Sequence, residues 1–247
     1  MIDFKYADLF KQNSVDVQLE IISDDEKIHI TNTEFHEEEF ELTESLCSQS
    51  ELTFGAVEAG SVKFKVSNIF LPMKGRWMTF KMIIGGHTDQ PFLIGRFKGY
   101  SDTPTADRKY RDVVAYDALY DILNADVAAW YNTVFPSHKE QQKDKDGKTT
   151  TVTVYDPVTM KQFRNSFFKH FGIEQADIAL INDNMSIEKT VAVTASSETS
   201  SATEESSTIG ESMSGKEVLS CICEINGCMG HMGRDGKFHY IYLEQNI

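Results

Sequence analysis

The residues best suited to chemistry gather near the C-terminal end of the sequence, where three cysteines and a histidine lie close together. Thiolate and imidazole groups are the usual zinc ligands, and the four candidates are Cys221, Cys223, Cys228 and His231. The first two fall in a segment with a helical pattern, where residues two apart point about 200° away from each other. The spacing also matches none of the usual zinc patterns. We predict buried structural cysteines and no metal site.

A second candidate is the acidic run formed by Glu37, Glu38 and Glu39. Neighbouring carboxylates serve as acid and base pairs or as cation ligands. Consecutive residues of a strand alternate between its two faces, so only Glu37 and Glu39 share one. No nucleophile and no glycine-bearing cation loop accompanies them. We interpret the run as a solvated or pore-facing acidic strand.

The remaining patterns offer no catalytic signature. The glycine-rich residues 85–88 are not followed by a helix that could present its N-terminus to a phosphate. The histidines are scattered, and no serine stands in a G-x-S-x-G setting. We therefore predict that the chain is not an enzyme and has no catalytic residue, cofactor or metal.

The acidic run belongs to a pair of predicted strands that organises the sequence. Apolar and polar residues alternate over residues 40–43 and again over residues 62–66, as in strands with one buried face. Residues 31–60 contain eight Asp or Glu and no Lys or Arg, whereas residues 61–100 contain seven Lys or Arg and one Asp. Opposite charges across a ladder favour that pairing by roughly 0.2–1 kcal/mol per pair. The two strands are therefore expected to be partners.

Short strands dominate the first half of the sequence. Residues 15–30 predict a hairpin, and residues 77–84 and 91–97 predict further strands separated by glycine-containing turns. After Tyr116 the period changes, because Leu119, Leu123, Val127 and Trp130 recur at helical spacing behind Asp117, a plausible N-cap. We place a domain boundary here and expect domains at residues 1–115 and 116–247.

Two helices and two hairpins are predicted in the second half. Residues 137–155 indicate an exposed hairpin, because a charged turn separates polar and threonine-rich strands. Capping boxes at residues 159–162 and 214–217 begin helices. Their buried stripes are, in order along the chain, Phe163, Phe167, Phe171, Val218, Ile222 and Ile225, and the helices end at Gly172 and Gly227. Residues 234–237 form the turn of a final hairpin.

One long segment lacks the composition of a folded element. Sixteen of the twenty-one residues from Thr194 to Ser214 are Ser, Thr or Glu, and none is Lys or Arg. Such a segment buries too little apolar surface to offset the entropy of ordering. We expect a disordered loop at residues 194–213.

Composition narrows the class of protein. The formal net charge of -14 argues against a protein that grips nucleic-acid phosphates, because that binding is carried by Lys and Arg. The N-terminus lacks a secretory signal, and no run of about eighteen apolar residues indicates a spanning helix. We expect a chain that begins in a cytoplasm, without a membrane-spanning segment. Four cysteines in 247 residues do not make a disulfide framework.

Residues 44–68, ESLCSQSELTFGAVEAGSVKFKVSN, resemble the N-terminal region of bacteriophage tail and baseplate hub proteins, including those of prophages and tail-like particles. Residues 214–240, SGKEVLSCICEINGCMGHMGRDGKFHY, look like the second domain of the same family, with shorter matches at AYDALYD, residues 115–121, and NDNMSIEKT, residues 182–190. The resemblance implies an α+β fold with an N-terminal tail-tube-like β-barrel. A mixed α/β domain follows, with a helix plus a β-hairpin at its C-terminal end. The Ser/Thr/Glu-rich loop is longer than is usual in the family.

The function implied by the resemblance is structural. Such a hub is a homotrimer in the virion tail, assembled in the bacterial host cytoplasm, which joins the tail tube or distal tail protein to the spike or baseplate around an axial channel. A channel that passes DNA should be acidic, and Glu37, Glu39, Glu41 and Glu44 are the predicted lumen-facing residues. Strand alternation places Glu44 on the opposite face unless a bulge intervenes.

Two other functions stay open at this point. Family members usually continue beyond the position of Tyr242, so the chain could be the N-terminal part of a tail-associated peptidoglycan hydrolase whose catalytic module lies beyond residue 247. A carbohydrate-binding module is the other alternative, and it would need an exposed aromatic platform.

Overall fold

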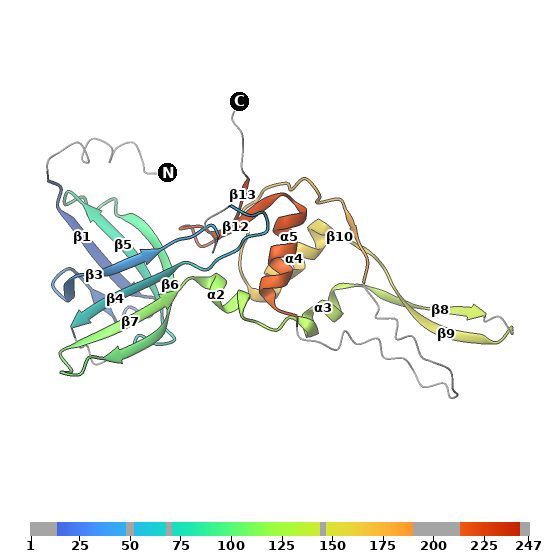
Figure 1. Cartoon of the computed structure of the whole chain (residues 1–247), viewed down its shortest axis with the longest axis horizontal. Helices are drawn as coiled ribbons and strands as arrows, with labels where there is room; N and C mark the ends of the chain where they lie inside the picture. The colour runs from blue at the N-terminus through green and yellow to red at the C-terminus, as the bar shows by residue number, and fades with distance from the viewer. Residues whose placement is uncertain (1–13, 48–51, 68–70, 144–146, 190–212, 243–247) are drawn as a thin grey trace, which may run out of the picture.

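A computed structural model describes residues 14–47, 52–67, 71–143, 147–189 and 213–242. The molecule is elongated, with a curled sheet at one end, a helical region in the middle and a two-stranded ribbon at the other end (Figure 1). The fold is α+β with a barrel-like sheet first and a helix followed by a β-hairpin last, as predicted. No helix of the described residues is long and apolar enough to cross a membrane.

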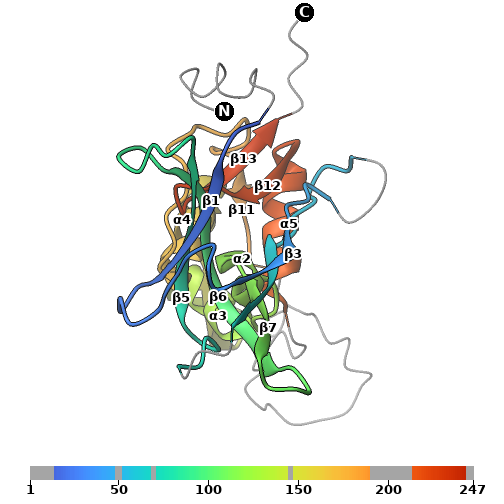
Figure 2. The ribbon, with the colours of Figure 1, turned by 90° about the vertical axis from the view of Figure 1, so that its left-hand side faces the viewer.

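The first part of the chain is a seven-stranded antiparallel sheet in the order β2-β1-β5-β6-β7-β4-β3. The sheet curls into a nearly closed barrel, seen from its own end in Figure 2. Its strands are β1 (Val17–Ser23), β2 (His29–Ile30), β3 (Phe35–Thr43), β4 (Ser61–Ser67), β5 (Trp77–Ile84), β6 (Phe92–Pro104) and β7 (Tyr110–Tyr116).

The predicted alternation places apolar side chains inside the curled sheet. In β4 every second residue is buried, and the Phe64 ring lies 5.5 Å from the fully buried ring of Phe80 in β5. Phe97 of β6 meets Phe80 from another side at 5.3 Å. The predicted hairpin is confirmed by the pairing of Ile21 with Ile30, and both side chains are buried.

The two ends of this sheet differ. β2 covers only part of β1, and beyond it the Asn32 side chain takes the place of a strand. Its Oδ1 accepts the Leu19 backbone N–H at 2.6 Å, and its Nδ2 donates to the Val17 carbonyl at 3.2 Å. At the other end β3 is the last strand, with a bulge between Phe35 and Phe40. The β1 end is therefore closed by a side chain, whereas β3 ends the sheet as a strand.

The helix predicted from Asp117 through Trp130 is wrong as a single element. The structure has two helices, α2 (Ala118–Leu123) and α3 (Ala128–Val134). The backbone between α2 and α3 instead forms hydrogen bonds with residues 213–215, at the start of the last helix. The Val127 N–H donates to the Met213 carbonyl at 2.8 Å, and the Gly215 N–H donates to the Ala125 carbonyl at 2.8 Å. Asp117 is the N-cap of α2, as predicted.

The ribbon consists of β8 (Ser137–Lys143) and β9 (Thr149–Tyr155), joined by seven register pairs. All of β8 is exposed and no residue of β9 is buried, which confirms the predicted exposed hairpin. After the ribbon, β10 (Val158–Thr159) leads into α4 (Met160–Phe171) and pairs with β11 (Ser186–Ile187).

Helix α4 follows its sequence signals closely. Thr159 and Gln162 form the capping box, and the chain leaves the helix at Gly172 with φ at +66°, a value that glycine adopts without strain. Phe163 and Phe167 are buried and Phe171 is partly buried, so the phenylalanine stripe is core, as predicted.

The last elements are α5 (Gly215–Ile225), β12 (Cys228–Met232) and β13 (Phe238–Tyr242). The Ser214 and Glu217 capping box and the final hairpin are confirmed. The predicted burial of Ile225 is wrong, because its side chain is 39% exposed while Leu219 is fully buried. Gly227 follows the helix at φ +65°.

Two hydrophobic clusters hold the molecule together. One lies inside the curled sheet and is made of residues from Ile21 to Ala115 in the sequence. The other packs the helices α2, α3, α4 and α5 and the last hairpin against one another. Val57 belongs to the second cluster although it precedes β4, because it bridges to Gly230 of β12. The division into domains at residue 116 stays a prediction. The segment at 194–213 lies, apart from Met213, outside the described residues.

Candidate functional site

Five charged side chains lie together on the outer side of β3, β4 and β7, and we call them the charged strand face: Glu39, Glu41, Lys63, Lys65 and Asp112. Glu41 stands opposite Lys63 in the ladder, with Oε2 3.6 Å from Nζ. The Lys65 ammonium lies 2.7 Å from Glu39 Oε1 and 3.7 Å from Asp112 Oδ1. The predicted opposite charge of β3 and β4 is therefore confirmed.

These pairs neutralise most of the acidic charge that the sequence places here. The hydrogen bond from Lys65 lowers the pKa of Glu39, and the same bond raises the pKa of Lys65. Glu39 and Glu41 therefore share their face with lysines rather than form a purely acidic wall. The side chain of Glu37 lies outside the described part of the structure. A groove of about 660 Å³ runs along the face, lined in part by His36, Phe40 and Phe64.

Glu44 does not join this face. It follows the end of β3, and its Oε2 lies 3.5 Å from the Arg234 guanidinium in the turn of the last hairpin. Both residues line a second groove of about 610 Å³, between the sheet and the C-terminal elements. Glu44 was predicted with the other lumen candidates, but this contact directs it toward the junction of the two parts.

Asp117 lies buried in the wall of the same junction. Its Oδ2 accepts the Gly60 N–H at 2.7 Å and its Oδ1 accepts the Leu119 N–H at 2.9 Å, so one carboxyl connects the start of β4 to the start of α2. Burial raises the pKa of Asp117 to about 6, against the effect of these N–H donors. Both oxygens are engaged by backbone groups, which indicates a structural role.

The cysteine cluster divides between two environments. Cys223 and Cys228 are buried, and the Cys228 thiol donates to the Cys223 carbonyl at 3.4 Å. Cys221 is exposed, so its predicted burial is wrong, and the helical phase separates it from Cys223 as expected. Burial lowers the pKa of His231. Within the described residues, no three His, Cys, Asp or Glu side chains are placed to hold one metal ion.

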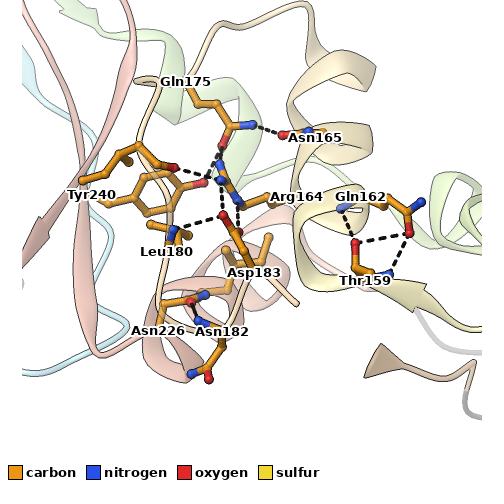
Figure 3. Close-up of polar contacts among 12 residues, drawn as sticks. Thr159, Gln162, Arg164, Asn165, Gln175, Leu180, Asn182, Asp183, Asn226 and Tyr240 are labelled. Atoms are coloured by element: carbon orange, nitrogen blue, oxygen red, sulfur yellow. Dashed lines mark hydrogen bonds and ion pairs between the residues drawn. The ribbon is translucent and has the colours of Figure 1, made fainter. Parts of the chain in front are cut away.

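Sequence reasoning missed a buried polar network around Arg164 of α4 (Figure 3). The guanidinium donates to both Asp183 oxygens, from Nε at 2.7 Å and from Nη2 at 2.9 Å. It also donates to Gln175 Oε1 at 2.5 Å and to the Ile178 carbonyl at 3.0 Å. Tyr240 of β13 donates to the same Gln175 oxygen at 2.7 Å. The network fixes residues 173–185 against α4 and β13.

A group of three tyrosines was also missed. The rings of Tyr116 and Tyr120 stack at 4.1 Å, and Tyr100 meets both edge-on at 5.5 and 5.1 Å. Tyr100 is 52% exposed. A hydrogen bond with Tyr100 raises the pKa of Tyr120 to about 12. Lys98 and Asp121 lie beside the rings and line a shallow depression of about 190 Å³ with them. We call these rings the tyrosine cluster.

Comparison with known proteins identifies the fold. No protein-family model matches the chain. No curated protein matches it. Among solved structures, the 43 kDa tail protein of prophage MuSo2 from Shewanella oneidensis matches with a TM-score of 0.51 and 12% identity, over 91% of this chain and 54% of that one. The prophage tail protein gp18 from Listeria monocytogenes EGD-e matches with a TM-score of 0.46 and 11% identity, over 91% of this chain and 50% of that one.

The chain thus spans about half the length of each of these proteins. At this level of identity the likeness to the MuSo2 protein concerns the fold. It extends over nearly the whole chain, so it takes in the barrel-like sheet and the elements that follow it.

Proposed function

We propose that this chain is a structural protein of a phage tail or tail-like particle, and that it forms part of the hub that joins the tail tube to the baseplate or spike. The observation that carries the proposal is the fold likeness to a prophage tail protein over 91% of the chain. The resemblance of residues 44–68 and 214–240 to hub proteins supports the position within the tail. Location in the virion tail and assembly in the host cytoplasm belong to the same proposal.

In this role the chain is a homotrimer around an axial channel and carries no catalytic activity. Its neighbours are the tail tube or distal tail protein on one side and the spike or baseplate on the other. The proposed channel lining is Glu37, Glu39 and Glu41, whereas the contact between Glu44 and Arg234 argues against Glu44. Because Lys63 and Lys65 share that face, the wall would be weakly negative, which still avoids retaining phosphate.

The test is localisation in an assembled particle. An epitope tag is fused in frame to the chain in its native genome, and purified tails are labelled with gold-conjugated antibody and viewed by negative-stain electron microscopy. Gold at the distal end of the tube, where it meets the baseplate, is expected. Gold spread along the tube or confined to the head end, or tails without the tagged chain, would refute the hub position.

The tyrosine cluster favours carbohydrate binding as a second function. Tyr100 is the exposed ring of the cluster, and an aromatic ring beside polar side chains is suited to a ligand with one apolar and one polar face. Titration of the chain with soluble fragments of the host cell-wall polysaccharide, followed by NMR, should perturb Tyr100 and its neighbours. Unchanged spectra for the native chain, or identical shifts in a Tyr100→Ala variant, would exclude this function for the cluster.

A further inference from the structure

Within the described residues, the β8–β9 ribbon buries none of its side chains in a hydrophobic core. It stands away from the helical region at the end of the molecule opposite the barrel (Figure 1). All seven residues of β8 are exposed, and in β9 only Val152, Val154 and Tyr155 are half-buried. An isolated two-stranded ribbon is at best marginally stable in water. The exposure of the ribbon therefore indicates that another surface stabilises it.

Neither outer edge of the ribbon has a partner strand within the described residues. Near the base of β9 the side chain of Lys189 covers the Tyr155 ring at 3.7 Å, and Glu188 lines the same depression. No strand of the described residues pairs with β8 except β9. Unpaired N–H and C=O groups along such an edge are a template for pairing with another chain. β8 carries two lysines, Lys139 and Lys143, against one acid, Glu140, so its net positive charge favours an acidic partner.

The matching edge is β3, the last strand of the curled sheet. Within the described residues no strand pairs with its outer side. Phe35–Thr43 contains four glutamates and no lysine or arginine, so the strand keeps a net negative charge although Glu39 and Glu41 pair with Lys65 and Lys63. The 660 Å³ groove runs beside it. The other end of the sheet is closed by Asn32, which bonds the free backbone of β1. Among the described strands of the sheet, the β3 end therefore offers the acidic edge of comparable length.

The two edges cannot meet within one molecule. The ribbon and the curled sheet lie at opposite ends of the long axis, with the helical region between them (Figure 1). A contact between them joins two copies head to tail. Such heterologous contacts close into a ring or extend into a filament, depending on the rotation between neighbours.

We propose that β8 of one copy pairs with the β3 edge of a second copy, with Lys139 and Lys143 beside the glutamates of β3. This contact adds a strand to the curled sheet and orders the ribbon in the same step. Lysines on an edge strand discourage pairing with unrelated edges, which makes the acidic strand the preferred partner. The contact between β8 and β3 does not depend on the proposed function, and only the number of copies in a closed ring rests on the proposed trimer.

The first test removes the ribbon. Residues 138–154 are replaced by a short glycine-serine link between Ser137 and Tyr155, which face each other in the register. Because no buried side chain is lost, thermal unfolding of the variant should match that of the native chain. Sedimentation equilibrium should show concentration-dependent association of the native chain at an ionic strength of about 0.05 M, where charged contacts are little screened, and a monomeric variant.

The second test reverses charge without removing backbone. Lys139→Glu with Lys143→Glu should weaken association at least about tenfold, because attractive contacts at the interface become repulsive. The matched control is Lys27→Glu with Lys109→Glu, two exposed lysines in turns of the sheet, and it should change association less than about twofold. Mixing the Lys139 and Lys143 variant with a Glu41→Lys variant should restore part of the association, because one interface again pairs opposite charges.

Three outcomes would overturn the inference. The first is a native chain that stays monomeric up to about 100 µM, a concentration at which even a weak interface would be populated. The second is a ribbonless variant that associates like the native chain. The third is an equal effect of the two charge reversals on association. Association without the ribbon would leave the proposed tail function standing. If the tagged chain is absent from tails but the purified chain associates through its ribbon, the tail function is refuted and the contact is supported.

Discussion

Replacing Arg164 by methionine should destabilise the second hydrophobic cluster by about 3–5 kcal/mol, the cost of breaking one partner of a buried ion pair. The Arg164 side chain is 3% exposed and that of Asp183 is 9% exposed. In the variant, the Asp183 carboxylate keeps the Leu180 N–H at 3.0 Å but loses both charge-assisted bonds. The Ile178 carbonyl loses its guanidinium donor as well.

Removing both charges separates the cost of an orphaned charge from the worth of the pair. Arg164→Met with Asp183→Leu should lie within about 2 kcal/mol of the native chain, because no buried charge is left without a partner. The remaining loss comes from the Leu180 N–H, which then has no acceptor, and from the Ile178 carbonyl, which then lacks its guanidinium donor. The coupling energy between the two sites should therefore be at least about 1 kcal/mol, because the double variant loses less stability than Arg164→Met alone.

The assay is urea unfolding followed by the fluorescence of Trp130, which packs against Phe163 and Phe167 of α4. A Trp77→Phe background removes the other of the two tryptophans, so the signal reports this cluster alone. Lys169→Met, an exposed change on the same helix, is the control and should cost less than about 1 kcal/mol. A loss below about 1 kcal/mol for Arg164→Met, or a double variant as unstable as that single one, would refute the reasoning.

The pair also fixes the sign of a pH effect. The hydrogen bond from Arg164 lowers the pKa of Asp183 below its ordinary value of 3.8. The ion pair therefore contributes its full stability above pH 3.8, and this contribution is lost as the pH falls through the lower pKa that Asp183 has in the folded state. The double variant should lose less stability than the native chain below about pH 4.

Three further outcomes are expected. Because burial raises the pKa of Asp117 from 3.8 to about 6, this one group should contribute a loss of about 3 kcal/mol of folding stability as the pH rises through that interval, at 1.36 kcal/mol per unit. Unfolding at pH 4 and pH 7 checks this, and an Asp117→Asn variant that keeps the same slope would contradict it. Gly215→Ala should lower stability by roughly 1–3 kcal/mol, because its Cβ would lie 2.0 Å from the Ile122 carbonyl oxygen, and an unchanged urea midpoint would be evidence against that close approach. Limited proteolysis should cut first within residues 194–213, as their composition predicts, and a first cut inside the sheet would speak against that expectation.

Structural features that depend on residues close together in the sequence were predicted correctly. The capping boxes at Thr159 and Ser214 were recognised because a hydroxyl and an amide or carboxylate three residues later are sufficient to form them. The strand predicted at residues 77–84 coincides with β5, because glycine-containing turns on both sides mark its ends. These features depend on local geometry and need no knowledge of distant contacts.

Features that depend on distant partners were missed or mistaken. The interruption between α2 and α3 follows from backbone bonds to Met213 and Gly215, which the helical period before it does not reveal. Arg164 was overlooked because its partners come from separate elements, and a charged residue on an amphipathic helix ordinarily indicates solvent. Strand alternation already placed Glu44 on the opposite face from Glu41, but the sequence did not reveal its contact with the distant Arg234.

The insertion of Val57 into the second cluster constrains when the chain can finish folding during synthesis. The Gly55 N–H donates to the Cys228 carbonyl and the Gly230 N–H donates to the Ala56 carbonyl, each at 2.9 Å. A ribosome adds roughly 5–20 residues per second, so this early segment waits on the order of 10 s for its partner strand. The curled sheet can collapse in the meantime, but its neighbour cannot close until β12 has emerged. Nascent chains arrested before Cys228 should therefore expose the apolar surface around Val57 to chaperones.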